Sequence, residues 1–246
     1  MQTETAIPDS VFAVANSTLL LTRIRSGNVY EETVERILQT IKLGFASPGQ
    51  RLPAERDLAG LMGVSRDTVR VAISSLVEAG FLEISRGRYG GTFVCASLPE
   101  EVTAHAKFES KALEEAILFR EVVECGAAYQ SAKSDLSSDQ QKALHQAHRD
   151  TTYSSAADYR RFDSRFHLLI AESCGSNKLL EEVAFSRSRI NEMLDQIPLL
   201  PPNIEHSNEQ HQEILEAIIG RNPTLASELM RVHLEGSAAL LRGFLS

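Results

Sequence analysis

The first third of the chain places apolar residues at the spacing of short amphipathic helices. One helix is predicted from Tyr30 to just before Gly44, and a second over the segment AERDLAGLMG, which stops at Gly63. A third is predicted after Ser65, a favourable N-cap residue, and it ends before Gly80. The apolar positions on the inner faces of these helices are Val34, Ile37, Leu38, Ile41, Leu43, Leu58, Leu61, Met62, Val69, Ile73, Leu76 and Val77.

The pattern then changes to that of a β-hairpin. The segment FLEIS alternates apolar and polar residues, RGRYGG is rich in turn residues, and TFV is a returning strand. The last two helices are joined by the tight turn Gly63-Val64-Ser65, and the hairpin follows as a wing. Residues 28–96 are therefore predicted to form a winged helix-turn-helix, an architecture typical of DNA-binding proteins.

Strand signals are not found beyond this hairpin, and the rest of the chain has the pattern of helices. Residues 1–27 lack a clear period and are predicted to be an N-terminal arm, which could fold back on the body, and residues 97–108 to be a linker. Residues 109–246 are predicted to form an all-α antiparallel bundle of six or seven helices, so the whole chain is mainly α. The six helices expected there lie at roughly 109–133, 138–153, 155–174, 177–196, 207–220 and 223–244.

The charges are distributed unevenly between these two domains. Residues 28–96 hold eight Lys or Arg and eight Asp or Glu, whereas residues 97–246 hold 15 bases and 23 acids. The net charge of -8 therefore resides in the helical domain, which we do not expect to contact DNA. Three widely spaced cysteines, no signal peptide and no apolar run of the roughly 20 residues that a membrane span needs favour a cytoplasmic protein without a membrane partner.

The predicted second helix of the helix-turn-helix carries donors suited to reading DNA. Arg66 and Arg70 are four residues apart and share one face, so that Arg66 could bind a guanine edge while Ser65 or Thr68 binds a phosphate. The alternative is that the arginines only solvate the helix surface, which the complete order of helix, turn, helix and wing disfavours. Further candidates for DNA contact are Arg56 in the preceding helix and Arg86, Gly87 and Arg88 in the wing.

The segment LPAERDLAGLMGVSRDTVRVAISSLVEAGFL, followed by GGTFV, resembles the DNA-binding domain of the GntR family of bacterial regulators. The resemblance covers about residues 28–95. It implies a regulator, expected to be a repressor, that binds a palindromic operator in double-stranded DNA as a homodimer. Asp67 departs from the family pattern, because small or hydroxyl residues or proline are more usual there, and its carboxylate could repel phosphate or tune the operator. The DNA contacts that the resemblance implies are Arg56, Ser65, Arg66, Thr68, Arg70 and Gly87, with Arg86 as a further candidate.

The helical domain contains a candidate metal site. Asp163 and His167 are four residues apart, and such a pair lies on one helix face, where it forms either a surface pair or two metal ligands. His211 and His233 occur in two later helices, each on a stripe with apolar residues, so both can point into a bundle core. Four inward ligands would form a His3Asp site with open coordination positions, suited to zinc, nickel, manganese or iron.

Residues 109–244 resemble the FCD effector-binding domain, which defines the FadR-type branch of the GntR family. The resemblance implies metal ligands in the motifs D-x-x-x-H, H-x-x-I-L-x-A-I and M-x-x-H-L, and all four positions are present as Asp163, His167, His211 and His233.

Arg120 occupies the position of the arginine in the first helix of this domain, where it would bind a small carboxylate effector. Its alternative role is an ion pair with Glu124 in the same helix. Arg187 and Arg189 could line the cavity, but both are expected at the surface.

The function predicted from these features is transcription regulation in response to a small organic acid. Two alternatives stay open. A metal site with open positions could belong to an enzyme that activates water, although no carboxylate is identifiable by spacing as its general base. The bundle could also bind a fatty acyl thioester, as some FadR-type members do, although the complete metal set argues against this. We therefore predict that the chain is not an enzyme.

Overall fold

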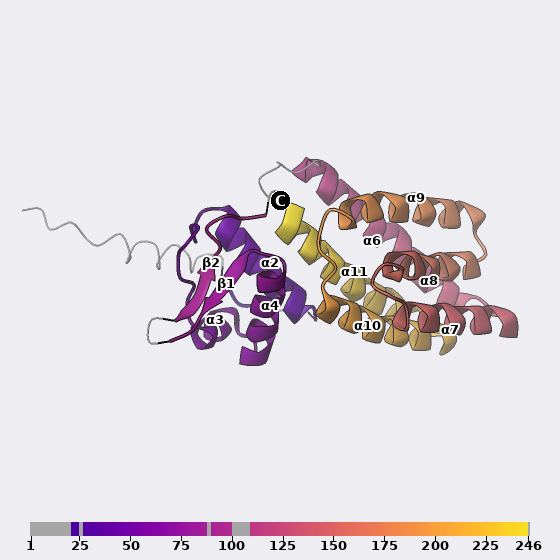
Figure 1. Cartoon of the computed structure of the whole chain (residues 1–246). Coiled ribbons are helices and arrows are strands. Elements are labelled where there is room, and N and C mark those ends of the chain that lie inside the picture. The colour runs from indigo at the N-terminus through magenta and orange to yellow at the C-terminus, as the bar shows by residue number, and fades with distance from the viewer. Residues whose placement is uncertain (1–20, 25–26, 88–89, 100–108, 246) are drawn as a thin grey trace, which may run out of the picture. The chain divides into compact units, whose positions relative to one another are not determined.

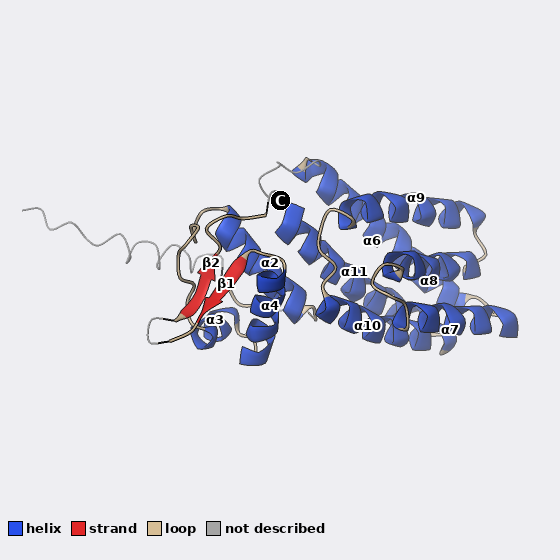
Figure 2. Ribbon diagram, viewed as in Figure 1, coloured by secondary structure: helices blue, strands red, loops and turns tan. Residues whose placement is uncertain are grey.

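The structure is a computed structural model, and it describes residues 21–24, 27–87, 90–99 and 109–245. The chain divides into two compact units, Met1–Ala106 and Lys107–Ser246, each described here by itself. Both strands belong to the first unit, while the regular structure described in the second unit is helical (Figures 1 and 2). The predicted arm and linker lie largely outside the described residues.

Three helices form the body of the first unit: α2 (Val29–Lys42), α3 (Glu55–Met62) and α4 (Arg66–Glu78). They agree with the three helices predicted from the apolar pattern. Helix α4 packs against both α2 and α3. The side chains at this junction are almost completely buried and include Val34, Ile37, Leu38, Leu58, Met62, Val69, Ile73 and Leu76.

The turn between α3 and α4 depends on Gly63. This residue ends α3 in the left-handed conformation, with φ at 68°, which glycine adopts without steric cost. A Cβ atom at this position would also lie 2.7 Å from Cγ of Arg23. Two residues later, the Ser65 side chain caps α4 by accepting a hydrogen bond from the Thr68 backbone N–H at 3.0 Å. Glycine and serine together therefore set the angle at which α4 leaves the turn.

The wing is an antiparallel hairpin of β1 (Leu82–Ser85) and β2 (Gly91–Val94). In its register, Leu82 pairs with Val94, and both side chains are buried. The segment before α3 adds to the hairpin, because the Leu52 N–H donates to the Thr92 carbonyl at 2.9 Å and Arg51 forms a bridge with Phe93. The strand segment before the helix-turn-helix thus fixes the wing to the body.

Part of the N-terminal arm is described, and it packs on the first unit. Leu21 and Ile24 are buried, and the Ile24 N–H donates to the carbonyl of Met62 at 2.9 Å. The arm therefore folds back on the body over residues 21–24, next to the end of α3.

The second unit is a bundle of six described helices arranged around α6 (Figure 1). Helix α6 packs against α8, α9, α10 and α11. One core cluster extends over α6, α7, α8, α10 and α11, with Phe166, Ile170, Ile214 and Leu215 almost fully buried. None of the helices in the described part of the chain has both the length and the apolar character to cross a membrane. The bounds are α6 (Ser110–Lys133), α7 (Ser138–Thr152), α8 (Tyr159–Ser173), α9 (Asn177–Leu194), α10 (Pro201–Ile219) and α11 (Pro223–Leu245).

Two helix starts differ from the prediction. Helix α10 begins at Pro201 rather than near residue 207, because its first two residues are prolines. Proline is well tolerated in the first turn, where no helical N–H partner is needed, so the proline segment is a start signal here and not a break. Helix α8 begins at Tyr159 rather than at 155, since Ser155 and Asp158 form a turn that precedes it.

The Ser65 cap of α4 leads to a prediction about stability. Replacing Ser65 with alanine removes the acceptor for the Thr68 N–H, and we expect the first unit to lose about 1 kcal/mol of stability. Hydrogen exchange of peptides covering α4, measured without DNA, should show faster exchange in Ser65→Ala.

The matched control is Ser74→Ala, at an exposed position within the same helix. Because alanine is the better helix former, this variant should exchange as slowly as the wild type or more slowly. Equal exchange rates in the Ser65→Ala variant and the wild type would show that the cap contributes nothing.

Candidate nucleic-acid interface and metal centre

The first turn of α4 presents an exposed set of donors. The Ser65 and Thr68 hydroxyls lie 2.8 Å apart at the start of the helix, and Arg66 is exposed beside them. A helix N-terminus carries unpaired N–H groups and a partial positive charge, so this turn attracts phosphate oxygens as well as offering side-chain donors.

Arg70 is held in place by two carboxylates. Its Nη1 lies 2.9 Å from Oδ1 of Asp67, and its Nε lies 3.4 Å from Oε2 of Glu55 in α3. Asp67 therefore contacts a neighbouring arginine on its own helix. The side chains of Arg70 and Asp67 remain largely exposed, so their ion pair orients the guanidinium more than it stabilises the fold.

The remaining candidates for DNA contact are also at the surface. Arg56 is 80% exposed, with Nε 3.3 Å from Oδ1 of Asp57. Arg86 and Gly87 follow β1 and are exposed, and Gly87 has a φ of 108°, which favours glycine. Arg88 lies outside the described residues.

The four predicted metal ligands meet in the interior of the second unit. Asp163 and His167 come from α8, His211 from α10 and His233 from α11, and one ligand atom of each lies within 4.8 Å of all the others. The Nε2 atom of His233 is 3.2 Å from Nε2 of both His167 and His211. Oδ1 of Asp163 lies 3.4 Å from Nε2 of His211 and 3.8 Å from Nε2 of His167.

The hydrogen bonds around this cluster fit a metal ion. Nδ1 of His233 lies 3.1 Å from Oε1 of Gln210, and Nδ1 of His167 contacts the Glu124 carboxylate. Both oxygens are acceptors, so each Nδ1 is the donor, and in a neutral imidazole with this tautomer Nε2 presents its lone pair to the cluster. Lone pairs at 3.2 Å repel each other unless a cation lies between them. Nitrogens bound to one zinc ion at 2.0–2.1 Å are roughly 3.0–3.4 Å apart, which agrees with the spacing here.

The protonation states also suit a divalent cation. Burial lowers the pKa of His211 to about 3, an effect that the Asp163 carboxylate offsets only in part, and it holds the pKa of His233 well below its usual value. Burial opposes the charge of Asp163, but the neighbouring cationic groups, of which Arg187 has the largest effect, together outweigh burial and keep the pKa of this carboxyl well below its ordinary range. At neutral pH these three side chains are neutral imidazoles and a carboxylate, the forms that bind metals.

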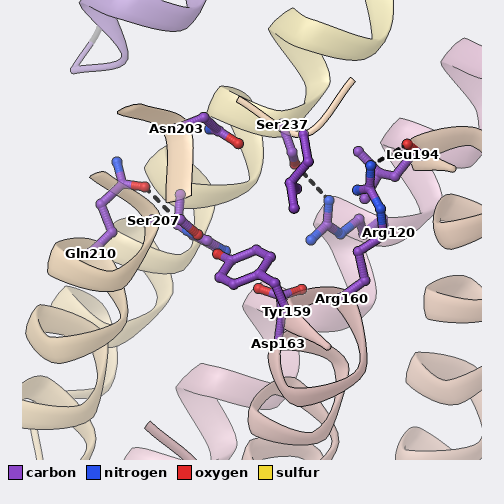
Figure 3. A pocket seen from close by; sticks show the side chains of 11 residues that line it. Arg120, Tyr159, Arg160, Asp163, Leu194, Asn203, Ser207, Gln210 and Ser237 are labelled. Carbon is purple, nitrogen blue, oxygen red and sulfur yellow. Dashed lines mark hydrogen bonds between the residues drawn. The ribbon is translucent and has the colours of Figure 1, made fainter. Parts of the chain in front are cut away.

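A pocket lies beside this cluster, and Arg120 lines it together with Asp163 and His233 (Figure 3). The Nε atom of Arg120 lies 2.9 Å from Oε1 of Glu124, and its Nη1 donates to the Ser237 hydroxyl at 2.7 Å. The alternative of an ion pair with Glu124 is therefore present in the structure, and it leaves Arg120 among the residues that line the pocket.

Two buried residues contact the metal ligands in ways that were not predicted from the sequence. Glu124 contacts His167, Arg120 and Arg187, and burial opposes its charge, but these three neighbours outweigh burial and hold the pKa of its carboxyl well below the usual range. Its ion pair with Arg120, four residues earlier, was one of the two predicted alternatives for that arginine, whereas its contact with His167 was not predicted. Gln210 precedes His211 and binds a different histidine, His233, and nothing in the sequence pattern marks this contact.

The prediction that Arg187 lies at the surface was wrong. This side chain is 2% exposed, and its Nη2 forms an ion pair with Oδ2 of Asp163 and donates to the Ser164 hydroxyl at 3.0 Å. Burial opposes the charge of Arg187, but Asp163 and Glu124 outweigh it and raise the pKa. Arg189 is at the surface as predicted, with Nη1 3.0 Å from Oε2 of Glu192.

Comparisons with known proteins agree with both halves of this architecture. Residues 29–94 match the model of "Bacterial regulatory proteins, gntR family", and residues 115–236 match that of the FCD domain. The chain is 30% identical to the "Putative HTH-type transcriptional regulator RmpR" of Mycobacterium gastri, over 82% of this chain and 76% of that protein. It is 29% identical to the "Putative L-lactate dehydrogenase operon regulatory protein" of Escherichia coli (strain K12), over 83% of each.

A solved structure supports the fold. The E. coli protein McbR/YncC superposes with a TM-score of 0.51 at 18% identity, covering 86% of this chain and 96% of that one. A DNA-binding winged helix-turn-helix joined to a helical sensor domain defines a ligand-responsive transcriptional regulator. The chain belongs to the GntR family, with an FCD domain as its C-terminal part. Because the relatives are regulators, the alternative of a metal-dependent enzyme is not retained.

The buried ion pair between Arg187 and Asp163 leads to a second prediction, which concerns stability. Replacing Arg187 with alanine leaves the Asp163 carboxylate buried without its strongest cationic partner, which should cost about 3 to 5 kcal/mol of unfolding free energy. Chemical denaturation of the metal-free protein measures this cost.

The control is Arg189→Ala, two residues along the same helix. It removes a 48% exposed side chain and its ion pair with Glu192. Its effect should stay within about 0.5 kcal/mol. Similar small losses in both variants would contradict the assignment of Arg187 to the buried charge network.

Proposed function

We propose that this regulator acts as a homodimeric repressor of the FadR-type branch, and that it senses a small organic acid at a divalent metal ion held by its FCD domain. The observation that carries the proposal is the convergence of three Nε2 atoms and one carboxylate oxygen within 4.8 Å, beside a pocket lined by Arg120. The ligands would be Asp163, His167, His211 and His233, and zinc, nickel, manganese and iron all suit this donor set.

Two groups in this pocket would attract a carboxylate. A metal ion bound to the cluster would act as a Lewis acid that accepts carboxylate oxygens. The Arg120 guanidinium at the pocket wall supplies charge-assisted hydrogen bonds to the same group. One relative is a putative regulator of an L-lactate dehydrogenase operon, which agrees with a small acid as effector.

A fatty acyl thioester fits this pocket less well. Nine of the eleven lining residues are polar, and only Leu194 and Leu199 are aliphatic. A long acyl chain needs apolar walls, because burying polar groups against hydrocarbon without partners is unfavourable. We therefore retain the small acid as the effector class.

DNA binding in this proposal uses the first turn of α4. Arg66 would contact a base edge, and Ser65, Thr68 and Arg70 would fix the helix against the backbone, with Arg56, Arg86 and Gly87 as further contacts. The two-fold symmetry of a homodimer would be mirrored in a palindromic operator. The acid can change the affinity for DNA only to the extent that it binds one arrangement of the dimer more tightly than another.

Metal content tests the sensor part of the proposal. After reconstitution with each candidate metal and removal of excess, we expect about one ion per chain in the wild type and almost none in His211→Ala. Elemental analysis measures the content. At a free metal concentration of about 100 times Kd, the ion should stabilise the wild type by roughly 2.7 kcal/mol, visible as a raised melting temperature.

The control variant is His145→Ala, which removes an exposed histidine of α7. It should bind metal as the wild type does. If His211→Ala retained the full metal content, the proposed site would be wrong.

DNA selection tests the regulator part. Fragments of genomic DNA selected with the purified protein should be enriched in one near-palindromic sequence. On that sequence, Arg66→Ala should bind about five- to 150-fold more weakly, corresponding to roughly 1 to 3 kcal/mol, as measured by fluorescence anisotropy at fixed salt.

The control is Arg149→Ala, an exposed arginine in α7 of the helical unit, which should leave DNA affinity unchanged. Failure to enrich any palindrome, with or without candidate acids, would refute the proposed mode of DNA binding.

A further inference from the structure

The exposed face of α4 carries more kinds of chemical group than its arginines. Its exposed residues recur at i, i+1, i+4, i+5 and i+8, so they form one stripe along the helix, and the residues between them are buried or half-buried. The last four have the spacing i, i+3, i+4 and i+7, which the recognition helix of homeodomains uses to read the major groove. The stripe can therefore face base edges well beyond the first turn. Its members are Arg66, Asp67, Arg70, Val71 and Ser74.

Asp67 has a carboxylate oxygen that is available to DNA. Its side chain is 85% exposed, and Oδ1 lies 2.9 Å from Nη1 of Arg70. Within the described part of the chain, the other oxygen, Oδ2, takes part in no hydrogen bond or ion pair. On DNA this oxygen would lose its water close to phosphates, which is unfavourable unless a donor replaces the water. In the major groove, the amino group of cytosine is the donor that suits a carboxylate.

Val71 is the apolar member of the stripe. It is 40% exposed and lies four residues after Asp67, one helical turn further along the same face. Valine is a weaker helix former than alanine or the long charged residues, so the folding of α4 does not favour it at an exposed position. The C5-methyl group of thymine is the apolar group of the major groove, and apolar side chains recognise it.

We infer that Asp67 and Val71 determine the operator sequence of this regulator. Asp67 accepts a hydrogen bond from the amino group of a cytosine, and Val71 packs on the methyl group of a thymine. Four residues of a helix span about 6 Å, so these two bases lie within about two base pairs of each other. The inference rests on the proposed use of α4 in the major groove and deepens it, because it adds two base contacts to that of Arg66.

The test of Asp67 compares the selected operator with its base-pair variants, using the full chain and fluorescence anisotropy at fixed salt. Replacing one C·G pair of a half-site with T·A should weaken binding of the wild type about five- to 150-fold. Asp67→Ala should bind both operators equally well. Asp67→Asn should prefer adenine at this position, because an amide pairs with both the donor and the acceptor of adenine.

The control for this test is Glu78→Ala, which removes an exposed acid at the end of the same helix. It should keep the base preference of the wild type. Equal base preferences in the wild type and Asp67→Ala would overturn the role of Asp67. So would an Asp67→Ala variant that binds every operator more tightly by one factor and with a steeper salt dependence, because the carboxylate would then only repel phosphates.

The test of Val71 replaces the thymines of the operator one at a time with deoxyuridine, which lacks only the C5-methyl group. At one thymine of a half-site, the wild type should lose about fourfold in affinity, the effect of one buried methyl group. Val71→Ala should lose little or nothing at that position. The control Leu225→Ala removes a 44% exposed aliphatic side chain of α11 and should respond to deoxyuridine as the wild type does.

Two further results distinguish this inference from the proposed function. If the wild type and Val71→Ala respond identically to every deoxyuridine, the role of Val71 is wrong, while binding to a palindromic operator stands. If the wild type selects no palindromic operator, the proposed mode of DNA binding fails, and this inference fails with it.

Discussion

The helical unit depends on the neutralisation of buried charge. Asp163 and Glu124 are carboxylates in the interior of a bundle, and an unpaired charge there would cost several kcal/mol. Arg187 and Arg120 balance them, and each of these cations reaches the carboxylates from a defined helix. The positions of α6, α8 and α9 are thus linked by charge pairing as well as by apolar packing. The geometry of the histidine cluster depends on this arrangement, because Glu124 also contacts His167.

Much of this arrangement was predictable from the sequence, because it follows from local rules. Helix periods, the Gly63 turn and the Ser65 cap depend on neighbouring residues, and the i, i+4 spacing placed Asp163 and His167 on one face. Long-range contacts were not predictable in the same way. Arg187 and Arg189 look alike in the sequence, yet one is buried against Asp163 and the other pairs at the surface. Which face of α9 points inward depends on packing against α6 and α8, and the weak apolar pattern of that helix does not reveal it.

The start of α10 illustrates another limit. Proline usually indicates a break, and no helix was predicted between residues 196 and 207, but proline also favours the first turn of a helix. The extra turn and a half places Asn203 on the pocket wall, one turn before Ser207. An error of six residues in a helix boundary therefore hid part of the pocket, even though the histidine further along the same helix was identified.

The pairing of Arg70 with Asp67 and Glu55 bears on how this protein would search a genome. Non-specific attraction to DNA comes from counterions released when free cations meet phosphates, and it grows with the number of such cations. A guanidinium already balanced by two carboxylates contributes less to that attraction, and residues 28–96 have equal numbers of bases and acids. Such a unit spends less time on random sequence, so its occupancy of a site depends on directional contacts, and the ratio between specific and background binding rises.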